Sequence, residues 1–449
     1  MTQILYSSDW VLTVTSAAIQ NGAIVVEDTR IVGVGTAENL REQFPNASQK
    51  HFGKSVIMPG LINCHSHLEL TVMRGYLEKE ESDFFAWLRK LTFAKNELLT
   101  HEDLRVSATL GAAEALSAGI TCVGDACDYG MAGINALRDT GLRGIVYQES
   151  FGPDPKLVQE NFQKLKEKVV SLKEFETDLV RVGVSPHAPY SVCPQQLEII
   201  AGYALSENLP VMMHAAESAF EKEFMEGNGA FAVGLQKRGI EWNAPHISTI
   251  QHLAKHGILK TKPLLAHCIN VDERDLETIK AYGASIAHCP KSNAKLGHGF
   301  ASFASFIEHD LKVGLGSDSV ASNNINDMIE EARFALLLSR AVNKGGRMLE
   351  AEDLLKTITI GGANALGLEN KIGSLEEGKD ADFIVLSLEG NHLQPVHDIA
   401  STIIFTSSAR DVLLTVIAGK EVYKDGKVLT VDEERLKARM TEMRNKIAA

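Results

Sequence analysis

The chain has 449 residues, of which 45% are hydrophobic and 23% are charged, and its formal net charge is -13. This composition is typical of a soluble globular protein, and the length exceeds that of one ordinary core, so we expect a large barrel with a smaller unit beside it. The acidic balance argues against non-specific binding to nucleic acid, because it offers no basic surface to phosphates.

The sequence predicts neither a membrane span nor a targeting segment. No apolar run reaches the roughly eighteen residues that a span needs, and the start Met1-Thr2-Gln3 lacks the basic residues of a signal peptide. The six cysteines are scattered without a Cys-x-x-Cys pair, which fits reduced thiols better than a disulfide framework or a zinc ribbon. We therefore expect a cytoplasmic protein that does not act at a membrane.

Residues 1–57 contain short apolar runs separated by polar turns. The runs are Trp10–Val14, Ala23–Val26 and Arg30–Val34. Alternating runs of this length predict a small antiparallel unit, which we take as the N-terminal part of a β-domain.

From Pro59 onward, short apolar runs alternate with longer helical patterns, which is the signature of repeated β-α units. The eight runs are Val56–Asn63, Ile120–Asp125, Leu142–Tyr147, Val180–Ser185, Pro210–His214, Leu264–Cys268, Ser285–Cys289 and Lys312–Ser317. Eight such units over about 310 residues predict an α/β fold with a (β/α)8 barrel, whose site lies at the carboxyl ends of the strands. We place the barrel at residues 58–368. A doubly wound open sheet is the alternative, but it would not put polar residues at nearly every strand end.

The remaining residues, 369–449, return to a β pattern. Strands are predicted at Phe383–Leu386 and Val412–Ala418, and the tail Asp432–Ile447 reads as an exposed amphipathic helix. These strands need partners, and so do those of residues 1–57. We therefore expect both chain ends to form one small composite β-sandwich domain beside the barrel.

Side chains that can bind a metal stand at the ends of six predicted strands. They are His65 and His67 on the first, His187 on the fourth, His214 and Glu217 on the fifth, His267 on the sixth, His288 on the seventh and Asp318 on the eighth. Residues i and i+2 of a strand point to the same side, so His65 and His67 are expected to share one cavity. A lone histidine is more often a surface or capping group, but their joint placement predicts a catalytic zinc or ferrous site. The fourth strand offers no lysine to bridge two ions, which favours one.

The residue types also indicate the chemistry. A divalent ion makes water a nucleophile near neutral pH, and Asp318 is placed to accept the proton of that water or to orient it. His267 is expected to hold the attacking oxygen, and Glu217 to carry a proton to a ring nitrogen and then to a leaving amine. Together these roles favour hydrolytic displacement at an electron-poor sp2 carbon. The alternative for Glu217 is that it only caps a helix.

Several motifs resemble those of the amidohydrolase superfamily, in its branch of nucleoside and heterocycle deaminases and chlorohydrolases. They are Pro59–His67, His187–Tyr190, His214–Glu217, Cys289–Asn293 and Gly314–Asp318. The resemblance implies one divalent metal ion per chain, zinc before iron, held by His65, His67, His214 and Asp318. It also implies Glu217 and His267 as catalytic groups and a homo-oligomer.

Within this branch the chain is similar to methylthioadenosine/S-adenosylhomocysteine deaminases and to aminofutalosine deaminases. That resemblance implies that His187 contacts the purine and that Trp87 lies in a loop covering the site. Asn96 stands where those enzymes place a glutamate for the ribose hydroxyls, with Glu97 one position further. The segment Lys156–Asn161 lacks the arginine expected for an amino-acid carboxylate.

These observations predict a metal-dependent hydrolytic deaminase whose small-molecule substrate is an aminopurine, with an adenosine-type nucleoside as first choice. The enzyme alternatives are a triazine-type chlorohydrolase or aminohydrolase and a guanine-type deaminase. A non-catalytic barrel that binds metal or ligand is the alternative from another class.

Overall fold

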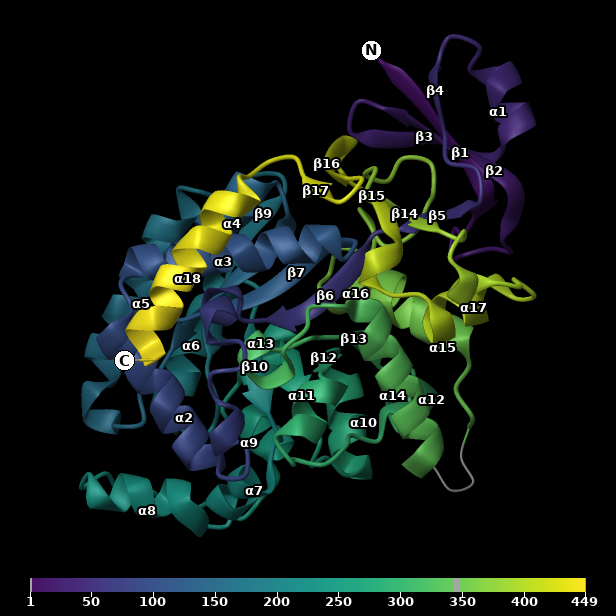
Figure 1. The fold of residues 1–449 in the computed structure, drawn as a ribbon. Coiled ribbons are helices and arrows are strands. Elements are labelled where there is room, and N and C mark those ends of the chain that lie inside the picture. The colour runs from purple at the N-terminus through teal and green to yellow at the C-terminus, as the bar shows by residue number, and fades with distance from the viewer. Residues whose placement is uncertain (1, 343–346, 449) are drawn as a thin grey trace.

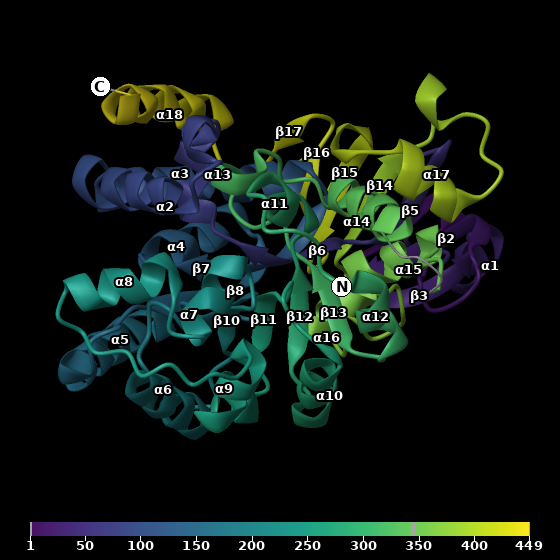
Figure 2. The same cartoon turned by 90° about the horizontal axis from the view of Figure 1, so that it is seen from below.

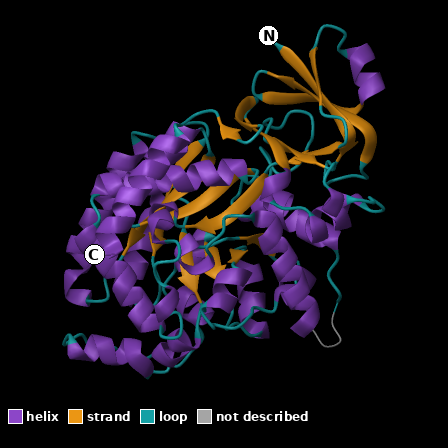
Figure 3. Cartoon of the chain, in the orientation of Figure 1, coloured by secondary structure: helices purple, strands orange, loops and turns teal. Residues whose placement is uncertain are grey.

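The computed structural model describes residues 2–342 and 347–448 (Figure 1). The chain forms a barrel of strands and helices, with a separate group of strands above it that the two chain ends build together (Figure 3). None of the helices in the described ranges is long and apolar enough to cross a membrane.

Eight parallel strands form the barrel, in two sheets of four. The first sheet contains β6 (Leu61–Ser66), β7 (Ile120–Cys127), β8 (Arg143–Ser150) and β9 (Val180–Pro186). The second contains β10 (Met212–Ala215), β11 (Leu264–His267), β12 (Ser285–His288) and β13 (Lys312–Leu315). Isolated parallel bridges join the sheets at both seams, Val184 to Val211 and Ser66 to Asp318. The predicted barrel fold is confirmed, with continuous ladders only inside each half.

Helices surround the barrel strands (Figure 2). They are α3 (His101–Ser117), α4 (Gly130–Thr140), α5 (Val158–Lys173), α6 (Pro194–Ser206), α9 (Thr249–Lys255), α10 (Glu273–Tyr282), α11 (Pro290–Lys295), α12 (Phe303–Glu308), α13 (Val320–Asn323), α14 (Met328–Val342), α15 (Ala351–Lys356) and α16 (Gly362–Ala365). Their ends carry the expected signals. Thr100 and Asp103 form a capping box at the start of α3, and Gly283 ends α10 in the left-handed conformation.

Three further helices stand beside the carboxyl ends of the strands. They are α2 (Phe84–Phe93), α7 (Ala219–Met225) and α8 (Gly229–Lys237). A π-helical turn, η3 (Ala94–Leu98), continues α2. Of these segments, α2, η3 and α8 line the cavity described below.

The predicted first barrel strand, Val56–Asn63, is wrong in its extent, because this run contains two strands. β5 (Ser55–Pro59) belongs to the β-domain, whereas β6 begins the barrel at Leu61. Gly60 separates them at a place with no room for a side chain, since a Cβ atom there would lie 2.0 Å from Oγ1 of Thr121. The sequence shows one unbroken apolar run, so the change of domain is visible only in the structure.

The β-domain is one nine-stranded sheet drawn from both chain ends. The N-terminal part supplies β1 (Gln3–Val11), β2 (Ile19–Glu27), β3 (Arg30–Thr36), β4 (Ser48–His51) and β5, with helix α1 (Ala37–Gln43). The C-terminal part supplies β14 (Phe383–Ser387), β15 (Val412–Ile417), β16 (Lys420–Lys424) and β17 (Lys427–Val428), with helix α17 (Ile399–Thr406). β5 joins the two parts, because it pairs with β1 on one side and β14 on the other. Tyr6 and Phe383 meet edge to face at 4.9 Å in the shared core, as the predicted composite domain requires.

Polar contacts attach the C-terminal segments to the barrel, among them ion pairs of Arg143 and of Asp103. Arg143, at the start of β8, makes buried ion pairs with Asp382 at 2.7 Å and Asp380 at 2.9 Å. The tail helix α18 (Glu433–Ala448) lies against α3 (Figure 1), where Lys446 reaches the buried Asp103 at 2.7 Å.

Candidate active site

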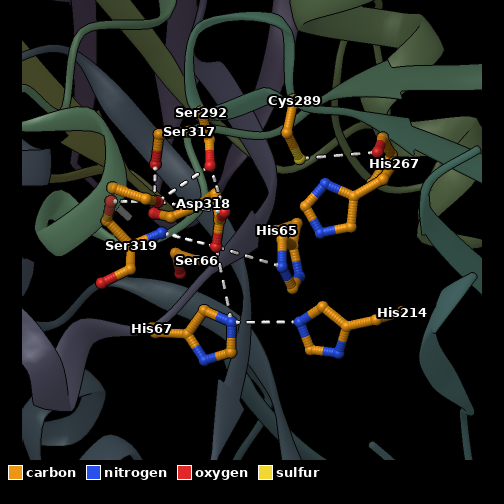
Figure 4. A network of polar contacts seen from close by, with 12 residues as sticks. His65, Ser66, His67, His214, His267, Cys289, Ser292, Ser317, Asp318 and Ser319 are labelled. Carbon is orange, nitrogen blue, oxygen red and sulfur yellow. Dashed lines mark hydrogen bonds and ion pairs between the residues drawn. The ribbon is translucent and has the colours of Figure 1, made fainter. Parts of the chain in front are cut away.

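Four of the predicted residues meet at the carboxyl ends of the barrel strands. His65 and His67 come from β6 and the turn after it, His214 from β10, and Asp318 follows β13. Nε2 of His65 and Nε2 of His67 each lie 3.5 Å from Oδ1 of Asp318, and Nε2 of His67 lies 3.3 Å from Nε2 of His214 (Figure 4). The predicted ligands therefore converge on one point.

This cluster has the donors and the orientation that a divalent cation needs. Nε2 of His65 is buried and has no hydrogen-bond partner among the described residues. Nδ1 of His214 lies 3.0 Å from the carbonyl oxygen of His187, which leaves Nε2 of His214 for the centre of the cluster. Burial and the neighbouring histidines lower the pKa of His214 well below its usual value and that of His67 to about 3, so both rings are neutral. Neutral imidazoles with one carboxylate fit zinc or ferrous iron.

Asp318 is held by its own surroundings. Oδ2 accepts hydrogen bonds from the hydroxyl groups of Ser292 at 2.5 Å and Ser322 at 3.1 Å, and Oδ1 accepts from the backbone N–H of Ser319 at 2.7 Å. Burial opposes ionisation, but the contact with His65 and the charges of the nearby histidines hold the pKa of Asp318 well below its usual value. The carboxylate is therefore ionised at neutral pH.

Glu217 and His267 stand beside this cluster. Oε1 of Glu217 lies 3.8 Å from Nε2 of His267. Burial and the charge of Asp318 raise the pKa of Glu217 to about 8, so its carboxyl group carries a proton at neutral pH. Nδ1 of His267 lies 2.9 Å from Oδ1 of Asn293, and its Nε2 has no partner among the described residues. A protonated acid and a free imidazole nitrogen thus face the same space.

Backbone strain gathers at the same strand ends. Ala216, His267 and Asp318 have φ angles of 53°, 74° and 58°, in the left-handed region that residues with a side chain avoid. Such conformations persist only where the surrounding structure imposes them, and they cluster at functional sites.

A cavity of about 830 Å³ opens over these groups. One wall is aromatic, with Trp87 from α2 and with Tyr190 stacked on Phe231 of α8 at 3.9 Å. The predicted substrate-binding residues His187, Trp87 and Glu97 all line this cavity. Trp87 is buried in helix α2 and does not lie in the loop that the resemblance implied, whereas Glu97 is exposed at η3, next to Asn96.

One strand-end histidine lies elsewhere. His288 ends β12, but its ring packs on Phe303 at 5.2 Å, and it is not among the residues that line the cavity. The sequence indicated a strand end there, but not the side to which the ring turns.

Two groups near the site escaped the sequence prediction. His298 follows α11, packs against Phe84 at 4.6 Å and places Nε2 3.8 Å from Oε1 of Glu217. His298 lies in a loop, and a prediction made from the ends of strands does not reach it. Glu149 lines the cavity from β8, whose predicted strand stopped at Tyr147. Extending that strand by two residues would have found it.

Comparison with known proteins decides the family. Residues 56–422 match the model described as the amidohydrolase family, and residues 22–47 match that of an imidazolonepropionase-like composite domain of bacteria. The chain belongs to the amidohydrolase family. This confirms the resemblance seen in the sequence and makes the protein a hydrolase, with a ligand set for a divalent metal ion.

Three similar proteins show how far this amidohydrolase resembles others. A 5-methylthioadenosine/S-adenosylhomocysteine deaminase of Desulforamulus reducens is 30% identical, over 100% of this chain and 99% of the relative. A 5'-deoxyadenosine deaminase of Methanopyrus kandleri is 31% identical, over 94% of each. The crystal structure of an adenosine deaminase from Xanthomonas campestris with bound zinc has a TM-score of 0.88 and 25% identity, over 100% of this chain and 99% of that one.

Proposed function

We propose that this amidohydrolase is a zinc-dependent hydrolytic deaminase of an adenosine-type nucleoside. The observation that carries the proposal is the protonated Glu217, which faces the free Nε2 of His267 3.8 Å away, beside the ionised Asp318. Replacing an amino group on an aromatic ring by oxygen needs a proton donor for the ring nitrogen and acceptors for the protons of water. The names of the most similar relatives support the same class of substrate.

Each residue of the site has a separate role in the proposed reaction. His65, His67, His214 and Asp318 would hold a divalent cation, which would supply Lewis acidity and lower the pKa of water. Asp318 accepts a proton from the attacking water, and Nε2 of His267 accepts a hydrogen bond from the same molecule. Glu217 gives its proton to the ring nitrogen next to the reacting carbon. Glu217 then takes the remaining proton of the added oxygen and gives it to the amino group, so that the carbon–nitrogen bond breaks, ammonia leaves and the ring carbon keeps the oxygen as a carbonyl group. The proton held by Asp318 returns to Glu217.

The substrate class is tested by ammonia release from the zinc-loaded enzyme. Adenosine, methylthioadenosine, aminofutalosine and guanine are compared, with chloride release from a chlorotriazine as the competing reaction. We expect turnover of one or more of the adenosine-type nucleosides. Silence on every aminopurine, or turnover of the chlorotriazine alone, would overturn the proposal.

Three further features belong to the proposal. They are a homo-oligomeric state, a cytoplasmic location and the division of the chain into a barrel and a composite β-domain, with one boundary at residues 368/369 and the other moved from the predicted 57/58 to Gly60, because β5 belongs to the β-domain. Light scattering of the purified protein tests the first.

A further inference from the structure

The Glu149 carboxyl group is a buried acid on the cavity wall, and the proposed reaction does not use it. It ends β8 next to Ser185 of β9, and the whole residue is 6% exposed. Oε1 of Glu149 is buried without a hydrogen-bond partner among the described residues. A buried polar atom left in this state costs free energy, so the site gains when a ligand supplies the missing partner.

Other buried acids near the cavity are satisfied by the protein itself. Glu69 accepts two backbone N–H groups at 3.1 Å, and Glu221 accepts two more at 2.8 and 3.1 Å. Glu149 resembles Glu217 instead, since each lines the cavity and neither carboxyl group accepts a backbone hydrogen bond from the residues that the structure describes. This shared property is expected of groups that meet a substrate.

Lys95, whose charge acts on Glu149, is paired with other acids. Nζ of Lys95 lies 2.8 Å from Oδ2 of Asp128 and 3.9 Å from Oε1 of Glu69. Lys95 therefore offsets part of the negative charge on this side of the cavity, but it does not donate a hydrogen bond to Oε1 of Glu149.

The location of Glu149 indicates which part of a ligand it meets. A ligand atom of Glu149 lies within 4.8 Å of ring nitrogens of His187 and His214. In a ring of eight strands in this order, β8 stands opposite β12. β12 lies between β11, which carries His267, and β13, which Asp318 follows. The leaving amine of a nucleoside must lie beside His267 and Asp318. Its other hydrogen-bond donors are the hydroxyl groups of its sugar.

We propose that Glu149 is a substrate-binding residue that forms a hydrogen bond with a sugar hydroxyl of the nucleoside. This inference rests on the proposed function and adds the group that selects a nucleoside over a free base. Burial raises the pKa of Glu149 to about 8. The charge of Lys95 lowers this pKa, whereas the charges of Asp128, Glu69 and Asp125 raise it further. A hydroxyl group suits either form of this side chain, because it can donate to a carboxylate and accept from a carboxylic acid.

The test combines changes in the enzyme with changes in the substrate. Wild type, Glu149→Gln and the control Glu167→Gln are assayed on adenosine and on its 2'-, 3'- and 5'-deoxy forms. Glu167 is the control because it is an exposed glutamate of α5 and is not among the residues that line the cavity. We expect Glu149→Gln to lower kcat/KM for adenosine about ten- to hundredfold, the usual cost of leaving one partner of a buried hydrogen bond unsatisfied. Metal content and melting temperature should stay at the wild-type values.

The decisive result is whether the loss of kcat/KM caused by Glu149→Gln disappears when one sugar hydroxyl is removed from the substrate. For the one deoxynucleoside that lacks the partner hydroxyl, wild type and Glu149→Gln should differ by less than about threefold. Equal losses on adenosine and on all three deoxy forms would overturn the inference while leaving the deaminase function intact. So would wild-type activity that does not change when any hydroxyl is removed, a measurement that needs no variant. Absence of turnover on every nucleoside would overturn both proposals.

Discussion

The backbone N–H of Asp318 donates a hydrogen bond of 2.9 Å to the carbonyl oxygen of His65. Two of the four proposed metal ligands are thus tied through the main chain, across the seam where the last barrel strand meets the first. The link does not involve the Asp318 side chain, so the carboxylate can be changed without opening the seam.

Asp318→Asn therefore tests the role of the carboxylate separately from the fold. We expect kcat to fall by about a thousandfold or more, within the range for a positioned base, with an unchanged circular dichroism spectrum. Asp310→Asn, at an exposed aspartate, is the control and should behave as wild type. Near-normal turnover by Asp318→Asn would refute the assigned role.

Glu217→Gln keeps the shape of the proposed acid and removes its proton. The metal should stay bound, while kcat falls by about a hundredfold or more. Because the raised pKa keeps Glu217 protonated below about pH 8, wild-type kcat/KM should decline above that pH. The variant should lose this decline. Glu223→Gln, on the exposed side of α7, is the matched control, and an unchanged pH profile in Glu217→Gln would assign the proton to another group.

His187→Gln should separate substrate binding from metal binding. The contact that orients His214 comes from the backbone carbonyl of His187, which the substitution retains. We expect a full complement of metal and a loss of about ten- to hundredfold in kcat/KM, typical of a lost polar contact with substrate. Elemental analysis that finds the metal gone would show that the side chain supports the metal site instead.

Removal of the metal should destabilise the protein. A ligand that binds only the folded state stabilises it by about 4 kcal/mol when its free concentration is a thousand times Kd. Treatment with a chelator should lower Tm, and added zinc should restore it. Elemental analysis is expected to find one ion per chain. Two ions would contradict the inference from the missing lysine on the fourth strand.

Arg143→Ala should be among the most destabilising single changes. It leaves Asp382, and with it Asp380, without the buried partner that lies 2.7 Å away. Breaking such a pair from one side costs about 3–5 kcal/mol. Arg105→Ala removes an arginine from the exposed pair with Glu102 and should cost about 1 kcal/mol or less. Denaturant titrations of both variants measure the difference, and equal midpoints would contradict the prediction.

The sequence predicted those parts of the site that follow from repeated strand ends. His65, His67, His214, His267 and Asp318 converge because parallel strands bring their carboxyl ends to one face of the barrel. The same rule failed at His288, since strand order does not determine which side of β12 the ring occupies. His298 depends on how a loop packs against Phe84, which no local pattern reveals. Gly60 was hidden because the strands on both sides of it are equally apolar.

The position of β5 has a consequence for engineering. This strand hydrogen-bonds to both ends of the chain and continues through Gly60 into the strand that carries His65 and His67. A fragment that begins at Leu61 would leave β14 without its β5 partner, and it would free the chain that enters the metal site. We therefore expect such a fragment to lose the metal site. Split or permuted versions will work only where β5 keeps both of its neighbours.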